Sequence, residues 1–460
     1  MSDLTKGKEL PAILKLALPI MGTSFVQMAY NMTDIAWLGR LGSDSVAAVG
    51  AAGFLVWLGN SLMMTTKIGA EVGIAQSIGR SDMGMARRVA GAATTLALVF
   101  ASVYALFSLF FAPNLIGFFG FSETGVAEQA ILYLRIVSGG MVFAYLNQTF
   151  SGVFNGKGDG RTPFYVNTLG LVVNMALDPL LIFGYGPFPA MGVAGAAMAT
   201  VLSQFIVAVV FAVLLKGKKT PLGKPQLFGK LEKVTVKPIV SVGFPVAAQM
   251  ALFSVIAMVV TRLVSGWGAL PVAVQSVGAQ IEAISWMTAS GFATALGTFT
   301  GQNFGSKKLG RIKRGYFGTL LLMTVVGLLP TLLFVFFGKE VFSLFIPEKE
   351  PIELGGIYLR ILAVSQIFMI WEITTSGLFN GVGKSNIPSY VGIVFTALRI
   401  PAAIYLSDVL DWGVEGIWWA ITFSSILKGV ILVAWAFARL LPELNAKHDE
   451  VLAKEQPMVV

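Results

Sequence analysis

The sequence contains no cysteine, and its one histidine, His448, lies in the polar C-terminal end. The absence of cysteine excludes disulfides and thiolate metal sites. A single histidine excludes histidine-ligated metal centres, catalytic triads that use histidine, and histidine proton relays. Charge is also scarce, because Asp, Glu, Lys and Arg make up only 12% of the 460 residues. We therefore expect no enzyme and no cofactor.

Long apolar segments are what the sequence does contain. Hydrophobic residues make up 55% of the chain and the mean hydropathy is +0.77, which is too apolar for a soluble protein of this size. A bilayer core of about 30 Å requires about 20 apolar residues per spanning helix. We predict an all-α polytopic membrane protein with twelve transmembrane helices. Their approximate spans are 12–40, 46–76, 90–112, 128–154, 163–185, 191–215, 237–265, 271–302, 315–338, 353–380, 387–407 and 413–440.

Basic residues predict how the chain is oriented, because cytoplasmic loops retain Lys and Arg. The chain ends and the loops that follow even-numbered helices hold 24 of the 33 basic residues. Both termini are therefore expected in the cytoplasm. The formal net charge of +9 is a topology signal on this interpretation, and it does not indicate nucleic-acid binding.

Two parts of the chain repeat one another. IYLRILAVSQIFMIWEITTSGLFNGVGKSNIP at 357–388 matches LYLRIVSGGMVFAYLNQTFSGVFNGKGDGRTP at 132–163 with an offset of 225, and Pro245 matches Pro19 with an offset of 226. Twelve helices in two such halves indicate two pseudo-symmetric six-helix bundles of the same orientation. The predicted parts are an N-terminal lobe over 1–215, a basic cytoplasmic linker over 216–236, a C-terminal lobe over 237–440 and a cytoplasmic tail over 441–460.

The repeated glycine-rich stretch, GVFNGKGDGRTP at 152–163, is interpreted as a tight helix hairpin. It lacks the patterns of dinucleotide-binding and phosphate-binding loops and follows no strand. Its glycines permit positive φ where a helix ends, and Pro163 suits the first turn of the next helix. We therefore expect no nucleotide site here.

Ionisable side chains inside membrane spans are costly, so each is a candidate functional group. Asp34 and Asp178 each lie 15 residues beyond a proline in helices that run the same way, about 22 Å along each helix. Asn174 shares a helix face with Asp178, and Thr200 enters the next helix at a similar depth. This oxygen-rich group suits Na⁺, and two neighbouring carboxyls can instead hold H⁺. Structural hydrogen bonding between helices is the alternative.

The repeat retains these polar residues in one half only. The positions equivalent to the four residues of the predicted cation site are Val260, Arg399, Ala403 and Ile421. We therefore expect the coupling ion, H⁺ or Na⁺, to bind in the N-terminal lobe.

The C-terminal lobe has two intramembrane acids of its own, Glu282 and Glu372. Carboxylates among aromatic and methionine side chains can hold an amphipathic organic cation. Ordinary helix packing of these side chains is the alternative. The residues assigned to a substrate cavity are Tyr30, Asn31, Gln275, Gln280, Glu282, Trp286, Met287, Trp371 and Glu372.

Two prolines are candidate hinges. Pro19 and Pro245 each remove a backbone hydrogen bond inside a predicted helix, so both helices are expected to bend. A bend at Pro19 would move Asp34, which lies on the same helix.

In order and spacing these motifs resemble the prokaryotic multidrug and toxic compound extrusion (MATE) transporters. The resemblance rests on LPI and DIAWLGRLG in the first helix, on AQSIGRSDMGMAR and GQNFGSKKLGR after the second and eighth helices, and on the paired GVFNGKGDGRTP and GLFNGVGKSNIP. It implies export of cationic or amphipathic drugs across the cytoplasmic (inner) membrane in exchange for H⁺ or Na⁺. It also implies a cation site at Asp34, Asn174, Asp178 and Thr200, although in some members the coupling acids lie in the C-terminal half.

The related superfamily includes flippases of lipid-linked saccharides, which are the alternative. A flippase needs a cationic cavity for phosphates, and Arg262, Arg399 and Lys428 are the residues that would supply it. An enzyme or a channel fits less well. The expected partners are small organic cations and the lipid bilayer, with no nucleic acid and no obligatory protein partner, because one chain contains the whole transport path and is expected to act as a monomer.

Overall fold

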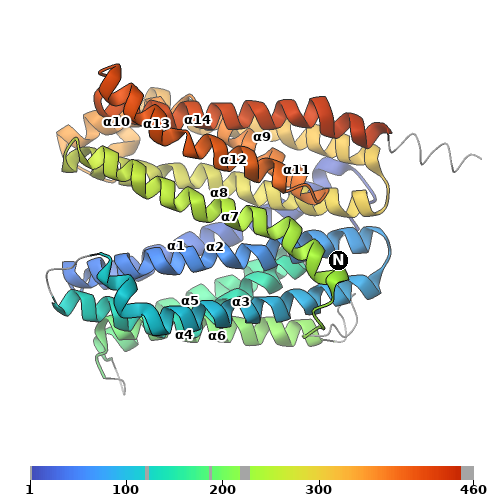
Figure 1. Cartoon of the computed structure of the whole chain (residues 1–460), viewed down its shortest axis with the longest axis horizontal. Helices are drawn as coiled ribbons and strands as arrows, with labels where there is room; N and C mark the ends of the chain where they lie inside the picture. The colour runs from blue at the N-terminus through green and yellow to red at the C-terminus, as the bar shows by residue number, and fades with distance from the viewer. Residues whose placement is uncertain (1–2, 120–123, 186–188, 218–227, 447–460) are drawn as a thin grey trace, which may run out of the picture. The chain divides into compact units, whose positions relative to one another are not determined.

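Helices coincide with every predicted span. The computed structural model describes residues 3–119, 124–185, 189–217 and 228–446, and the regular structure in those ranges is entirely helical. The elements are α1 (Glu9–Gly39), α2 (Ser43–Gly79), α3 (Met83–Gly117), α4 (Thr124–Gly156), α5 (Arg161–Phe183), α6 (Gly192–Lys216), α7 (Lys233–Ser265), α8 (Ala269–Gly305), α9 (Leu309–Ser343), α10 (Lys349–Ala363), α11 (Gln366–Gly381), α12 (Asn386–Ala397), α13 (Arg399–Ile404), the π-helix η1 (Tyr405–Val409), α14 (Gly413–Trp435) and the π-helix η2 (Ala436–Leu440) (Figure 1).

The apolar character of these helices confirms the membrane-protein class. Ten helical segments of the described chain are long and apolar enough to cross a membrane, and α10 with α11 forms one more when the bent pair is counted as one span. The remaining long helix, α8, has 37 residues but carries the polar side chains of Gln275, Gln280 and Glu282. Together these segments correspond to the twelve predicted spans.

The predicted span 353–380 is broken in the structure. Two residues separate α10 from α11, and the two helices are bent by 49°. The last three carbonyls of α10 accept hydrogen bonds from the hydroxyls of Ser365 (3.1 Å), Thr331 (3.4 Å) and Thr422 (3.1 Å). These hydroxyls give the carbonyls before the bend side-chain partners, in addition to the Ser365 N–H that donates to the Leu362 carbonyl at 3.0 Å. The sequence has neither proline nor glycine at the break, so it gave no sign of it.

Two compact units share the helices α1 and α7. Unit 1 is Gly22–Ala247, and unit 2 combines Asp3–Met21 with the chain from Ala248 onward. The beginning of α1 therefore lies in unit 2, and the beginning of α7 lies in unit 1. The predicted lobes had the beginning of α1 in the N-terminal lobe and the beginning of α7 in the C-terminal lobe, so each segment packs in the opposite unit. Parts of the predicted linker (218–227) and tail (447–460) lie outside the described residues.

The exchange occurs close to the two candidate hinge prolines. Pro19 lies just before the point at which α1 passes from unit 2 to unit 1, and Pro245 has the equivalent place in α7. Each helix is continuous through its proline. A Cβ on Gly243 of α7 would lie 2.0 Å from the backbone oxygen of Thr65 in α2, so that glycine permits the close packing of the exchanged segment.

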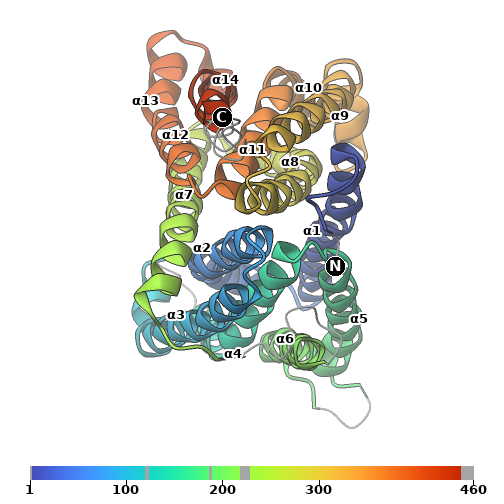
Figure 2. The ribbon, with the colours of Figure 1, turned by 90° about the vertical axis from the view of Figure 1, so that its right-hand side faces the viewer.

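The same close helix crossing occurs in both units, and a pair of glycines permits it in each. Gly152 and Gly156 of α4 face α2, and a Cβ on them would lie 2.3 and 2.5 Å from backbone oxygens of α2. Their repeat equivalents, Gly377 and Gly381 of α11, face α8 with corresponding distances of 2.2 and 2.5 Å. Figure 2 shows α2 beside α4 in unit 1 and α8 beside α11 in unit 2. Small residues spaced in this way allow membrane helices to approach closely.

The glycine-rich stretch between α4 and α5 is the predicted hairpin. Gly158 has a φ of +77°, and Gly383, its repeat equivalent, has a φ of +85°. The carboxyl group of Asp159 accepts hydrogen bonds from the Thr162 backbone N–H (3.2 Å) and hydroxyl (2.7 Å), which caps the start of α5. The positive φ of the glycine and the capping by Asp159 thus explain why the stretch is rich in glycine and contains Asp159 and Thr162.

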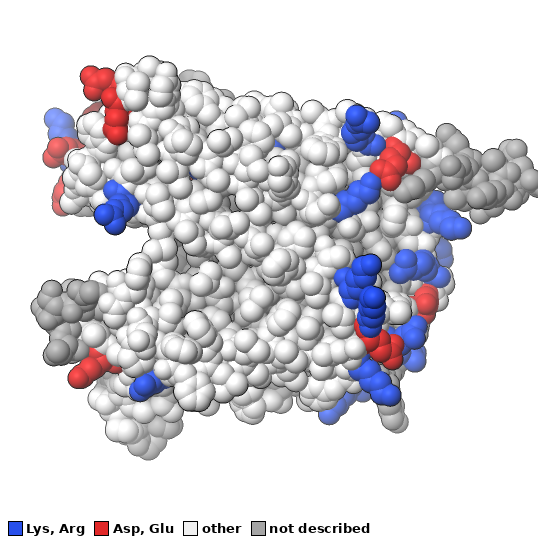
Figure 3. Space-filling model, viewed as in Figure 1, with Lys and Arg blue, Asp and Glu red and all other residues white. Residues whose placement is uncertain are grey.

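Charged side chains gather near the helix ends. On the face drawn in Figure 3, the middle of each unit is nearly free of charge, whereas Lys and Arg gather at one end. Exposed apolar side chains cover the helices between the ends, for example Phe107 and Phe110 on α3 and Leu321 and Leu329 on α9. This distribution is typical of a protein surrounded by lipid.

Candidate functional site

Three helices of unit 1 bring the four predicted cation-site residues together. Asp34 lies on α1, Asn174 and Asp178 on α5, and Thr200 on α6. Asn174 Nδ2 donates to Asp178 Oδ1 at 3.2 Å, and Thr200 Oγ1 donates to Asp34 Oδ2 at 3.5 Å. The carboxyl groups of Asp34 and Asp178 are close enough to interact directly. We call these four residues the aspartate site.

Local sequence explains how the helices place these groups. Asn174 and Asp178 are four residues apart, so they share one face of α5. Both side chains are fully buried. A Cβ on Gly195 of α6 would lie 2.3 Å from the backbone oxygen of Leu181 in α5. That close crossing brings α6, and with it Thr200, against the buried face of α5.

Three oxygen atoms of the aspartate site have no hydrogen-bond donor. Asp34 Oδ1, Asn174 Oδ1 and Asp178 Oδ2 are buried and accept no bond from the described part of the chain. A buried acceptor without a donor is costly, and two neighbouring carboxylates also repel each other. A proton shared by the carboxyls satisfies two of these atoms, whereas Na⁺ can bind oxygens of all three side chains. The arrangement therefore fits a small cation.

Two residues of the surrounding shell were missed from the sequence. Tyr30, a predicted cavity residue, and Ser203 share a hydrogen bond of 2.6 Å, and Ser203 Oγ donates to the Thr200 carbonyl at 2.8 Å. Tyr133 of α4 lies near both carboxyl groups. Ser203 was detectable, because it follows Thr200 by three residues on one helix face. No spacing in the sequence relates Tyr133 to the two aspartates.

In unit 2, the positions that the repeat aligns with the aspartate site include an apolar cluster. Val260 and Ala403, equivalent to Asp34 and Asp178, are buried in this cluster, and Ile421 packs against it. An apolar cluster offers no ligand to a cation. The asymmetry predicted from the repeat is therefore a difference in packing as well as in residue type.

The intramembrane acids of unit 2 belong to a different arrangement. Lys428 Nζ and Glu372 Oε2 form an ion pair of 2.8 Å, and both side chains are buried. Gln366 Nε2 donates to Glu282 Oε1 at 3.0 Å. The paired Lys428 neutralises Glu372, so that acid is not a bare anionic contact for a bound cation. Sequence analysis gave no partner for Lys428, although a lysine inside a span requires one.

Arg399 also lies inside unit 2. Its Nε and Nη2 atoms donate to the hydroxyls of Ser424 (3.0 Å) and Ser425 (3.1 Å), and its guanidinium carbon lies 5.6 Å from the ring centre of Phe253. Arg399 is within electrostatic range of both acids, Glu282 and Glu372. The two acids and two bases of this region therefore balance one another.

The other predicted cavity residues include two with hydrogen-bond partners of their own. Gln275 Nε2 donates to Thr261 (3.3 Å) and Gln275 Oε1 accepts from Trp418 (3.2 Å). Trp371 Nε1 donates to Thr324 Oγ1 at 2.8 Å. Asn31 and Gln280 are exposed, and Met287 is half-buried. Trp286 is 42% exposed and lies four residues beyond Glu282, so these two side chains share a face of α8.

Comparisons with known proteins agree with this architecture. The sequence model of the MatE family matches residues 19–180 and 245–405, two stretches that begin at the two hinge candidates. A relative from Thermotoga maritima, described as "Probable multidrug resistance protein NorM", is 30% identical over 453 residues, covering 96% of this chain and 94% of the relative.

Solved structures show the same fold. One, described as "Crystal structure of MATE in the bent conformation", matches with a TM-score of 0.90 and 24% identity over 97% of this chain and 98% of that one. Another, of "MATE in the straight conformation", matches with a TM-score of 0.89 and 24% identity over 96% and 98%.

Proposed function

The chain belongs to the MatE family, and from this premise we propose that it is a multidrug efflux transporter. It exports cationic or amphipathic organic compounds by antiport with H⁺ or Na⁺, through alternating access between its two six-helix lobes. The observation that carries this proposal is the aspartate site, in which three buried acceptor oxygens lack a donor within the described residues. The proposed transport involves no covalent step.

Ion uptake acts through the charge of the aspartate site. With Asp34 and Asp178 both ionised, repulsion inside an apolar helix bundle favours uptake of a cation. A proton lets one carboxyl donate to the other. Na⁺ would instead be held by the two carboxylates with the Asn174 amide oxygen and the Thr200 hydroxyl. Either ion neutralises charge on α1, the helix that begins in unit 2 and continues in unit 1.

Pro19 and Pro245 are the proposed hinges of this movement. Each removes a helical hydrogen bond just before the point where its helix changes units, so bending there costs less than elsewhere in the helix. Two solved structures with this fold are described as MATE in a bent and in a straight conformation, which supports a mechanism with a change of conformation.

Glu282 is the proposed contact for the positive charge of the substrate. It forms no ion pair among the described residues, whereas Glu372 is neutralised by Lys428. Trp286 shares its helix face and supplies an exposed aromatic surface for cation–π contact. No observation favours the flippase alternative, because Lys428 is paired and Arg399 donates to two serine hydroxyls.

We place the protein in the cytoplasmic membrane of a prokaryote with both termini in the cytoplasm. The support is the excess of Lys and Arg in the chain ends and the even-numbered loops. The proposed functional unit is one chain, because both lobes and the aspartate site are present in it.

Ethidium efflux from drug-sensitive cells tests the proposal. At matched membrane expression, Asp34→Asn is expected to reduce efflux at least about tenfold, because the site can no longer alternate between charged and neutral states. Glu340→Gln, which changes an exposed carboxyl on α9, is the control and is expected to leave efflux unchanged. Loss of efflux with a protonophore in Na⁺-free medium would assign H⁺, and a strict Na⁺ requirement would assign Na⁺. Normal efflux by Asp34→Asn would contradict the proposed coupling site.

A further inference from the structure

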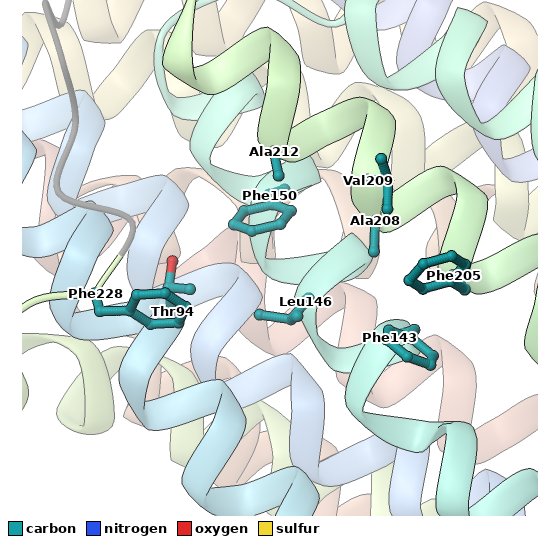
Figure 4. A pocket seen from close by; sticks show the side chains of 9 residues that line it. All are labelled: Thr94, Phe143, Leu146, Phe150, Phe205, Ala208, Val209, Ala212 and Phe228. Atoms are coloured by element: carbon teal, nitrogen blue, oxygen red, sulfur yellow. The ribbon is translucent and has the colours of Figure 1, made fainter.

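An apolar pocket lies in unit 1, and no residue of the aspartate site lines it. Its volume is about 190 Å³, and Figure 4 shows its lining side chains. They come from α3, α4, α6 and the segment before α7, and they are Thr94, Phe143, Leu146, Phe150, Phe205, Ala208, Val209, Ala212 and Phe228. Thr94 is the one polar residue of this lining, and its hydroxyl is satisfied by the Ala90 carbonyl at 2.9 Å. The pocket therefore offers no hydrogen bond to a polar ligand.

The segment before α7 is fixed at one side of this pocket. Thr95 Oγ1 donates to the Gly229 carbonyl at 3.0 Å, and the Gly229 N–H lies 3.1 Å from the same hydroxyl. A Cβ on Gly229 would lie 2.7 Å from the backbone nitrogen of Ala92, so the segment rests directly on α3. Phe228 is thereby held beside Thr94 at the pocket (Figure 4).

The pocket opens where the protein meets lipid. Phe205 and Val209 of the membrane-spanning α6 are exposed by 45% and 44%, and Phe228, in the segment before α7, is exposed by 64%. An apolar cavity of this size stays dry and binds hydrocarbon instead of water. In a bilayer, the hydrocarbon at hand is a lipid acyl chain.

Basic side chains lie next to the pocket at the end of α6. Lys216 lies four residues beyond Ala212, so it is about one turn further along the same face of α6. Lys230 follows Phe228 by two residues, and both lysines are exposed. From 228 to 237 the chain has three lysines against one acid, Glu232. A lipid with an anionic headgroup is favoured beside such a group of lysines.

We propose that this pocket binds one acyl chain of an acidic phospholipid from the cytoplasmic leaflet, with the lipid phosphate at Lys216 and Lys230. The assignment of the leaflet rests on the proposed topology. The bound chain packs against Phe228 and so stabilises the segment that leads from the linker into α7.

Native mass spectrometry of the full-length protein in detergent tests the proposal. Phosphatidylglycerol is expected to remain bound to wild type under conditions that remove phosphatidylcholine. Ala212→Phe fills the pocket and is expected to weaken phosphatidylglycerol binding about tenfold, because the chain loses its contacts. The matched control is Val213→Phe, at a lipid-exposed neighbour on α6 that does not line the pocket.

A surface variant keeps the test independent of folding. Lys216→Gln with Lys230→Gln is expected to weaken phosphatidylglycerol binding about fivefold per lysine and to leave phosphatidylcholine binding unchanged. Inorganic phosphate is expected not to compete, because it has no chain to occupy the pocket. Equal retention of the two lipids by wild type would overturn the proposal. So would displacement of the lipid by phosphate, or phosphatidylglycerol retention unchanged in both the Ala212→Phe and the double-lysine variants.

Discussion

At the scale of residues, the two aspartates of unit 1 and Glu372 of unit 2 have opposite surroundings. In unit 1, Asp34 and Asp178 lie together with acceptor oxygens that have no donor in the described chain. In unit 2, Glu372 has a buried lysine as its partner. A site that lacks a counter-charge is suited to take up and release an ion, whereas a paired acid is suited to hold helices together.

The Glu372–Lys428 pair provides a prediction at this scale. Glu372→Gln or Lys428→Met alone leaves a buried charge without a partner and is expected to cost about 3–5 kcal/mol of stability. The double variant is expected to recover most of this loss, because both charges are gone. Thermal unfolding of the purified protein in detergent measures the effect.

An exposed pair is the matched control for that experiment. Lys339 and Glu353 form an ion pair near the other end of unit 2, with side chains 38% and 54% exposed. The same double-mutant cycle there is expected to show no resolvable coupling, because solvent screens the two charges. If the Glu372 and Lys428 variants lowered stability additively, the buried pair would not act as a unit.

At the scale of elements, α1 runs from the core of unit 2 to the aspartate site of unit 1. The beginning of α1 packs in the core of unit 2 through Ile13, Leu16 and Ile20. The later part of the same helix carries Asp34 in unit 1. A charge change at Asp34 therefore acts on a helix that is anchored at both ends, with Pro19 between the two parts.

Pro19→Ala tests this connection. The substitution restores a helical hydrogen bond, so the folded protein is expected to be at least as stable as wild type. Ion-driven ethidium efflux is nevertheless expected to fall, by about tenfold, because the helix bends less readily. Pro330→Ala, in α9 and wholly within unit 2, is the matched control with a proline inside a helix. Equal efflux by the Pro19→Ala and Pro330→Ala variants would contradict the assignment of Pro19 as a hinge.

At the scale of the whole molecule, hydropathy and the repeat predicted the architecture well. Twelve apolar spans could be recognised because the bilayer sets a minimum helix length, although α3 begins seven residues and α9 six residues before the predicted start. The sequence did not predict that the beginnings of α1 and α7 pack in the opposite units. A continuous apolar helix can pack in either core, and its sequence does not distinguish the two. The break before α11 was hidden for a related reason, since its hydroxyl partners come from distant helices.

The candidate site was predictable to a similar degree. Helix spacing placed Asp34, Asn174, Asp178 and Thr200 at one depth, and the structure brings them together. The substrate cavity stays a prediction, because aromatic and amide side chains take part both in packing and in binding. Gln275 and Trp371 make hydrogen bonds within unit 2 that no sequence spacing indicated.

The most direct measurement is ethidium transport in proteoliposomes under an imposed ion gradient, comparing wild type with Asp178→Asn. The central claim is that the aspartate site couples ion movement to drug movement. Wild type is expected to move ethidium only when an H⁺ or Na⁺ gradient is present. The Asp178→Asn variant is expected to bind ethidium with similar affinity, because the proposed substrate contact, Glu282, is in unit 2, yet to show no gradient-driven transport. Gradient-driven transport by Asp178→Asn at the wild-type rate would contradict the account.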